Sequence, residues 1–347
     1  MQKTDSKLQS IEVARGIAAL LVVLYHTARH LDKNLGFPLG KQAFQFGHAG
    51  VDFFFVISGF IILYIHAPDL GRPERLGHYA QRRFTRIYPI YWVILAVTIA
   101  ELMVSGHTPT PTGLDMVWAA LLLPTALDPI VGVSWTLQSE VIFYIVFAVS
   151  ILNSRIGRWV MALWFAAILF ALAREQTGIA ARLASSYSLE FFLGMAVAYR
   201  LLHGTVPSAR TVLTIGLTLF IAVSYAEVIG LMDGYKPLAR LAYGVPSALI
   251  ILGLVQLERM GSIAMPASLL WLGRSSYSIY LFHLTIIGLA YKVAVSIKMP
   301  DWSPLWISFI TLVTAGIGGS VVISVFIEYP LMRWTRQSIS HRRSIMI

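Results

Sequence analysis

Apolar residues are gathered into about ten long runs along this 347-residue chain, separated by short polar connections. Each run has about 17–25 residues, enough for a helix to cross a hydrocarbon core of about 30 Å. A segment inside lipid must satisfy its own backbone hydrogen bonds, so these runs are predicted to be helices. The pattern therefore predicts an all-α polytopic membrane protein with about ten transmembrane helices. The runs lie near 11–31, 49–67, 88–105, 134–152, 157–174, 187–203, 211–229, 239–257, 268–292 and 304–327.

Three further expectations follow from the same pattern. The apolar stretch 114–125 is too short to span comfortably and is expected to lie in the interface or dip into the membrane. The first run holds an arginine and a histidine, and is expected to be retained rather than cleaved as a signal peptide. With no linker or repeat apparent, we expect a single membrane-embedded domain over 1–347, with its core at about 11–334.

Composition agrees with this class and excludes several chemistries. The chain is 57% hydrophobic and 13% charged, with a mean hydropathy of +0.70, whereas soluble domains carry about 25% charged residues. Because the chain has no cysteine, it has no disulfides, no thiolate metal site and no thioester on a catalytic cysteine.

The net charge of +10 is explained by topology rather than by nucleic-acid binding, because Lys and Arg gather in cytoplasmic loops. The connection between the second and third runs and the tail after the tenth are rich in arginine, whereas the connection 106–133 has neither Lys nor Arg. The positive-inside rule therefore places both termini in the cytoplasm and 106–133 outside. The arginines concerned are Arg72, Arg75, Arg82, Arg83 and Arg86 in the connection, and Arg333, Arg336, Arg342 and Arg343 in the tail.

Ionisable residues inside a span are costly and point to function by default. Arg15 and His26 lie eleven residues apart in the first span, which is three helical turns plus about 20° and a rise of about 16 Å. Both side chains therefore face the same direction, with Arg15 near the cytoplasmic end and His26 halfway across or further. A snorkelling Arg15 is the purely structural alternative.

The second and fourth spans also carry acids. Asp52 lies among aromatic residues at the start of the second span, where capping the helix is the structural alternative. In the same span, Gly59 is expected to be a close-packing position. Glu140 lies one to two turns inside the fourth span, after a hydroxyl-rich entry that includes Ser134 and Trp135. A structural hydrogen bond from Glu140 to another span is the alternative here.

The ninth and tenth spans complete the set. Ser276, Tyr280 and His283 are spaced i, i+4 and i+7, so they share one helical stripe. An interhelical polar contact without function is the alternative for this stripe. Glu328 closes the tenth span at its cytoplasmic end, where it is expected to pair with an arginine of the second connection.

These positions predict a vertical arrangement, with arginines on the inner side and His26, His283, Asp52 and Glu140 in the middle and outer parts. Arginine binds phosphate through forked hydrogen bonds, and a buried histidine with a carboxylate partner takes a proton from a hydroxyl. The arrangement indicates a phosphorylated donor bound from inside and a hydroxyl acceptor that is met deeper or outside.

Six segments, in this order, give the chain a resemblance to the membrane acyltransferase-3 family of bacteria, particularly to members that modify exopolysaccharide and O-antigen sugars. The resemblance covers about 11–334. The segments are Arg15-x10-His26, Gly50–Phe60 as Gly-Val-Asp-x-Phe-Phe-x-x-Ser-Gly-Phe, Arg83-x-x-Arg86, Ser134–Tyr144 as Ser-Trp-Thr-Leu-x-x-Glu with its extension, Ser276–His283 as Ser-Tyr-x-x-Tyr-Leu-x-His, and Glu328-Tyr329-Pro330.

The resemblance implies an O-acetyltransferase of the bacterial inner membrane that moves an acetyl group from cytoplasmic acetyl-CoA to a saccharide hydroxyl. It implies acetyl-CoA as co-substrate, no metal and no nucleic acid, with membrane lipids and polysaccharide assembly machinery as surroundings. By position, it implies three groups of residues. They are His26 as catalytic base with Asp52 and Glu140; Arg15, Arg83, Arg86 and Glu328 for the donor; and Ser134, Trp135, Tyr280 and His283 along the acceptor path.

Two alternatives from other classes stay open at this point. A transporter of an anionic or sugar-linked substrate uses the same kind of intramembrane charge, although carriers commonly show two related halves and none is apparent here. A scaffold for polysaccharide assembly would need no chemistry at His26. A succinyl donor, and a covalent intermediate on His or Ser in place of direct transfer, also stay open.

Overall fold

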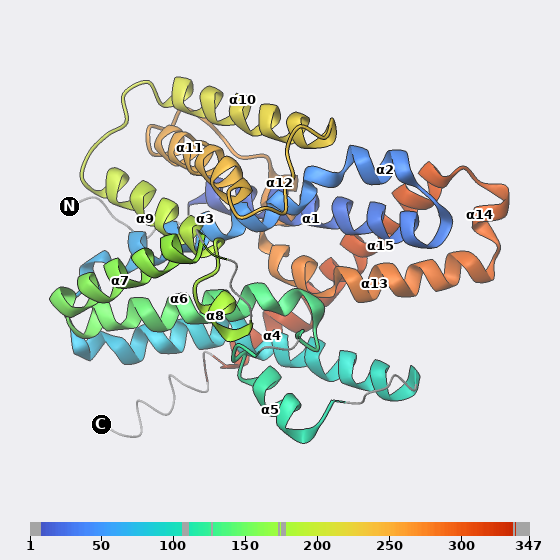
Figure 1. Ribbon diagram of the computed structural model, residues 1–347, viewed down its shortest axis with the longest axis horizontal. Coiled ribbons are helices and arrows are strands. Elements are labelled where there is room, and N and C mark those ends of the chain that lie inside the picture. The colour runs from blue at the N-terminus through green and yellow to red at the C-terminus, as the bar shows by residue number, and fades with distance from the viewer. Residues whose placement is uncertain are drawn as a thin grey trace.

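The computed structural model describes residues 8–105, 111–125, 128–172, 174, 178–335 and 337, and every regular element within them is a helix (Figure 1). The all-α prediction is therefore confirmed for the described chain. Arg336, Arg342 and Arg343 of the predicted cytoplasmic tail, and part of the 106–133 connection, lie outside the described residues.

Nine helices of the described chain are long and apolar enough to cross a membrane. They are α1 (Gln9–Leu35), α3 (Ala49–His66), α4 (Leu76–Ser105), α6 (Trp135–Leu152), α7 (Ser154–Leu172), α10 (Ala209–Val228), α11 (Ala239–Arg259), α13 (Ser276–Ser296) and α15 (Leu305–Ile323). The shorter helices are α2 (Pro38–Ala43), α5 (Gly113–Ala120), α8 (Gly178–Leu183), α12 (Ala267–Arg274) and α14 (Met299–Trp302).

The segment 187–203, expected to be one of about ten spans, is not among these nine helices. It forms α9 (Ser188–Leu202), whose 15 residues rise only about 22 Å, less than a hydrocarbon core of about 30 Å. α9 is nevertheless packed closely against α3 in the bundle (Figure 1).

Two glycines explain how closely α9 approaches α3. A Cβ atom on Gly59 would lie 2.1 Å from the carbonyl oxygen of Phe191, and one on Gly194 would lie 2.0 Å from that of Val56. Only glycine permits this backbone contact. The prediction that Gly59 is a close-packing position is therefore confirmed.

The segment predicted to be too short to span is a short helix docked on α4. Its N-terminus carries a capping box between Thr112 and Asp115. At its other end, backbone carbonyls accept hydrogen bonds from Tyr88, Tyr91 and Trp92 of α4, at 2.8–3.0 Å. These bonds tie the end of α5, where helix carbonyls lose their i+4 partners, to α4.

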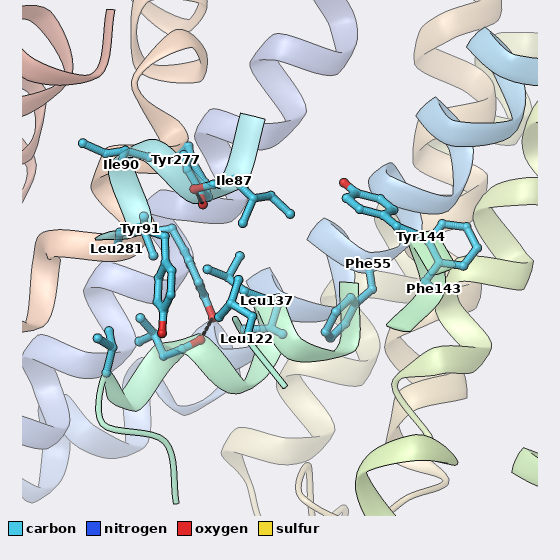
Figure 2. Packing of buried hydrophobic residues seen from close by; sticks show 14 of the residues in the cluster. Phe55, Ile87, Ile90, Tyr91, Leu122, Leu137, Phe143, Tyr144, Tyr277 and Leu281 are labelled. Atoms are coloured by element: carbon cyan, nitrogen blue, oxygen red, sulfur yellow. Dashed lines mark hydrogen bonds between the residues drawn. The ribbon is translucent and has the colours of Figure 1, made fainter. Parts of the chain in front are cut away.

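A large apolar core joins α3, α4, α6 and α13 around the site described below (Figure 2). Phe143 of α6 stacks on Phe191 of α9, with ring centroids 4.3 Å apart. Tyr277 of α13 donates to the carbonyl of Ile87 in α4 at 2.9 Å. This packing fixes the helices whose polar side chains face one another across the bundle.

Candidate active site

A cavity of about 1000 Å³ lies between α1, α3, α4, α6 and α13, at the upper end of the range of about 300–1,000 Å³ found for ligand pockets. Its wall follows α3 from Val51 to Ile65, a rise of about 21 Å. It is therefore an elongated passage within the bundle. Its polar lining includes Arg15, Arg82, Arg83, Arg86, Glu140 and Tyr280.

The arginines of this cavity come from two helices. Arg15 of α1 donates from Nε to Ser276 Oγ of α13 at 3.3 Å. Arg83 and Arg86 lie one turn apart on α4, over the rings of Tyr144 (5.6 Å) and Tyr277 (4.9 Å) respectively. Tertiary packing thus brings together the positive charges that the sequence assigned to the donor.

Glu328 forms an ion pair with one of these arginines, Arg86, on the side away from the cavity. Its carboxylate is fully buried and lies 3.5 Å from Arg86 Nη1, and it accepts hydrogen bonds from Ser278 (2.7 Å) and Ser324 (3.0 Å). The pairing of Glu328 with an arginine of the second connection is confirmed. Glu328 does not line the cavity itself, so it acts on the cavity through Arg86.

Glu140 also lines the cavity. Its Oε1 accepts hydrogen bonds from Ser58 at 2.9 Å and from Tyr144. The two donors hold the partly buried carboxylate in one orientation. Glu140 therefore lies in the same cavity as the arginines, between α3 and α6.

Tyr280 lines the cavity together with Thr136 and Phe54. Its hydroxyl lies 2.8 Å from Thr136 Oγ1 and 3.2 Å from the carbonyl of Val133. One helical turn further along α13 is His283, whose Nε2 lies 3.2 Å from Nδ1 of His26. The histidine pair thus stands next to the part of the cavity that Tyr280 lines.

Two contacts between α1 and α13 confirm that Arg15 and His26 share a face of the first span. Arg15 meets Ser276, and His26 meets His283. The two helices run side by side (Figure 1), with an arginine at one level and a histidine pair at the other.

Asp52 is held elsewhere in the bundle. Its Oδ2 lies 2.7 Å from Nη1 of Arg240 in α11, and both side chains are almost completely buried. The guanidinium also donates to the Gly234 carbonyl and lies 4.6 Å from the centroid of the Tyr187 ring. The grouping of Asp52 with His26 and Glu140 in one catalytic set stays a prediction, and the ion pair gives Asp52 a structural partner.

Ser134 and Trp135 lie at the start of α6, near the cavity but not on its wall. Ser134 is buried, and Trp135 packs on Tyr187 with ring centroids 4.9 Å apart. Their place on an acceptor path also stays a prediction. No group of three metal-ligating side chains is found among the described residues.

Sequence reasoning missed three buried charged residues of the helix bundle. Arg240 is one; another is Glu227, which accepts from His48 at 2.9 Å and from Tyr243 at 2.5 Å. A third is Glu190, which is fully buried in α9. All three were visible as ionisable residues inside predicted spans, the same signal that singled out Asp52.

Comparisons with known proteins identify the family. A family model described as "Acyltransferase domain" matches residues 8–329. The chain is 29% identical over 301 residues to exopolysaccharide production protein ExoZ of Rhizobium meliloti (strain 1021), covering 84% of this chain and 91% of ExoZ. It is also 23% identical over 378 residues to the putative peptidoglycan O-acetyltransferase YrhL of Bacillus subtilis (strain 168), covering 96% of this chain and 56% of YrhL. No solved structure matches.

The family match covers nearly all of the described chain and includes every residue that lines the cavity, as well as Glu328 behind Arg86. The resemblance first seen in six short segments is therefore confirmed over the whole bundle, and the transporter and scaffold alternatives give way to an enzyme. This chain is a membrane-embedded acyltransferase and belongs to the acyltransferase-3 family.

Proposed function

We propose that the protein transfers an acetyl group from acetyl-CoA to a hydroxyl group of a saccharide, with His26 as the base. The observation that carries this proposal is one continuous cavity, walled by Arg15, Arg83 and Arg86 and reaching the tyrosine next to the His26–His283 pair. Such a passage suits a long donor with phosphates at one end and a reactive acyl group at the other.

The donor's phosphates would bind at the arginines. Arg83 Nε is buried and has no hydrogen-bond partner within the described part of the chain, and an unmade bond of this kind is costly. A phosphate oxygen would supply the missing acceptor, and guanidinium groups bind phosphate through forked hydrogen bonds. The apolar side chains of α3 along the cavity, including Ile57 and Ile61, suit the uncharged arm of the donor.

The chemistry needs one proton acceptor near the thioester. His26 takes the proton of the acceptor hydroxyl as its oxygen attacks the thioester carbonyl. The C–S bond then breaks, and the leaving thiolate takes the proton from the imidazolium. Transfer is direct, no net proton is released, and no residue is modified in the cycle.

The acceptor class is supported by the relatives. One is named for exopolysaccharide production and another as a putative peptidoglycan O-acetyltransferase, and both names point to saccharide polymers, which supports a saccharide hydroxyl as the acceptor here. The inner membrane of a bacterium, beside the assembly machinery of a polysaccharide, is the location that fits such an acceptor and a cytoplasmic donor.

Binding and chemistry can be separated by experiment. We would measure acetyl-CoA binding to protein in lipid nanodiscs for wild type, Arg83→Ala/Arg86→Ala, His26→Ala and the exposed control Arg210→Ala. We expect binding to be lost in the double variant and kept in His26→Ala and Arg210→Ala. Acyl transfer to a saccharide, or slow donor hydrolysis, should require His26. Binding that is indifferent to Arg83 and Arg86, or transfer that persists in His26→Ala, would overturn the proposal.

A further inference from the structure

We propose that His283 is a positioning residue that fixes the ring of His26 as the tautomer protonated at Nδ1, leaving Nε2 of His26 as the nitrogen that accepts the proton. The use of that nitrogen in catalysis rests on the proposed function. The tautomer itself follows from the contacts of the two rings and is independent of any substrate.

His283 is fully buried in α13. Its Nδ1 lies 2.8 Å from the carbonyl oxygen of Tyr280 and 3.1 Å from that of Ile279. Carbonyl oxygens only accept hydrogen bonds, so Nδ1 of His283 must carry the proton. In a neutral imidazole the other nitrogen, Nε2, is then an acceptor.

The protonation of His283 determines that of His26. Nε2 of His283 lies 3.2 Å from Nδ1 of His26, and because Nε2 accepts, Nδ1 of His26 must donate. The same Nδ1 lies 2.9 Å from the carbonyl of Val22, which is also only an acceptor. Each contact favours a proton on Nδ1, and the two together fix it there, so Nε2 of neutral His26 keeps its lone pair.

His283 constrains the ring of His26 more than the α1 backbone does. Val22 lies four residues before His26, and its carbonyl is available to any histidine at this place in a helix. His283 contacts the ring from another helix, with centroids 4.9 Å apart and planes inclined at 55°, and Tyr25 packs edge-on at 4.8 Å. The ring is thereby fixed in orientation as well as in tautomer, the task that a second group performs for the base of a catalytic triad.

Because His283 is neutral, its hydrogen bond with His26 does not depend on the charge of His26. A neutral His283 accepts from Nδ1 before and after His26 takes up a proton, so the hydrogen bond persists when His26 becomes an imidazolium. The bond therefore keeps the ring in place through the cycle in which Nε2 gains and loses a proton.

Two variants of equal chemistry and different length test this role. In His283→Gln the amide oxygen reaches about the place of Nε2 and can accept from His26. In His283→Asn the amide reaches only about the place of Nδ1, so the bond to His26 is lost. His203→Gln, at the end of α9, is the matched control.

The primary readout is the ¹⁵N spectrum of histidine-labelled protein in lipid bilayers without substrate, with His26 assigned by the signals that His26→Gln removes. In wild type we expect Nδ1 of His26 to be protonated and Nε2 to be unprotonated. We expect a mixture of tautomers in His283→Asn and the wild-type pattern in His283→Gln and His203→Gln. Protonation of His26 at Nε2 in wild type, or an unchanged tautomer in His283→Asn, would overturn the proposal.

Kinetics provide the second readout. We expect His283→Asn to lower kcat about tenfold to hundredfold, part of the roughly 10²–10⁴-fold that general base catalysis contributes, with KM for acetyl-CoA unchanged and His283→Gln largely restored. An equal loss of kcat in both variants would contradict the tautomer's role in catalysis. If wild type transfers no acyl group while the spectra behave as expected, the proposed function fails and the tautomer assignment stands.

Discussion

Arg240 Nη1 lies 2.7 Å from Asp52 Oδ2, in an ion pair that joins α11 to α3 with both side chains almost fully buried. The partners are 188 residues apart in the chain. Removing one partner of such a pair leaves the other charge buried without compensation. The pair therefore ties two helices together and makes each residue depend on the other.

We predict that Arg240→Met and Asp52→Asn each destabilise the protein by about 3–5 kcal/mol. The double variant is expected to be more stable than Arg240→Met, because it no longer buries an unpaired carboxylate. Thermal unfolding in detergent would measure this order.

The same variants separate structure from chemistry at Asp52. Acyl transfer per folded molecule should be kept in Asp52→Asn, since Arg240 is the partner seen for its carboxylate. An Asp52→Asn protein that is folded but inactive would instead place Asp52 in the catalytic set predicted from the sequence.

Glu328 is predicted to act on the donor through Arg86. Glu328→Gln removes the charge 3.5 Å from the guanidinium and frees it to shift, so we expect KM for acetyl-CoA to rise several-fold with little change in kcat. Arg86→Ala should raise KM more, and Arg86→Ala/Glu328→Gln should add little to that. Steady-state kinetics of the three variants would decide; a fall in kcat at constant KM would contradict this role.

We predict that Arg83 binds the donor through the planar pair of N–H donors of its guanidinium group, and not through its charge alone. Its Nε is buried without a partner in the described chain, and lysine cannot present two parallel donors to a phosphate. We expect Arg83→Lys to weaken acetyl-CoA binding about tenfold, which equals about 1.4 kcal/mol. Isothermal titration would measure this, with Arg210→Lys as the control; equal affinity in wild type and Arg83→Lys would show that charge alone suffices.

The contact of α3 with α9 is predicted to tolerate no side chain. Gly59→Ala and Gly194→Ala would each place a methyl group about 2 Å from a carbonyl oxygen of the facing helix, so the helices must separate and stability should fall. Gly318→Ala is the matched control, since nothing lies within 4 Å of its added Cβ. Alanine there is expected to be neutral or to stabilise by about 0.5–1 kcal/mol. Thermal unfolding of the three variants would test this, and equal melting temperatures would contradict the packing described.

Much of the fold and part of the site depend on local rules that the sequence displays. Apolar runs long enough for lipid predict the helices, because backbone groups in a bilayer must be paired within the segment. Helical periodicity places Arg15 and His26 on one face, as their shared contacts with α13 confirm. The pairing of Glu328 with Arg86 was also predictable, because the loop charges predict that both lie at the cytoplasmic level.

Other features depend on packing between segments remote in sequence, which no local pattern encodes. The 15-residue helix α9 packs directly on α3 because Gly59 and Gly194 let the two backbones touch. Asp52 faces Arg240 on α11, and the cavity exists only where helices from distant parts of the chain meet. The proton on His26 is decided by a ring 257 residues away. Sequence alone determined which residues carry charge into the membrane, and the tertiary structure decided which of them meet, because contact across a bundle is set by how whole helices pack.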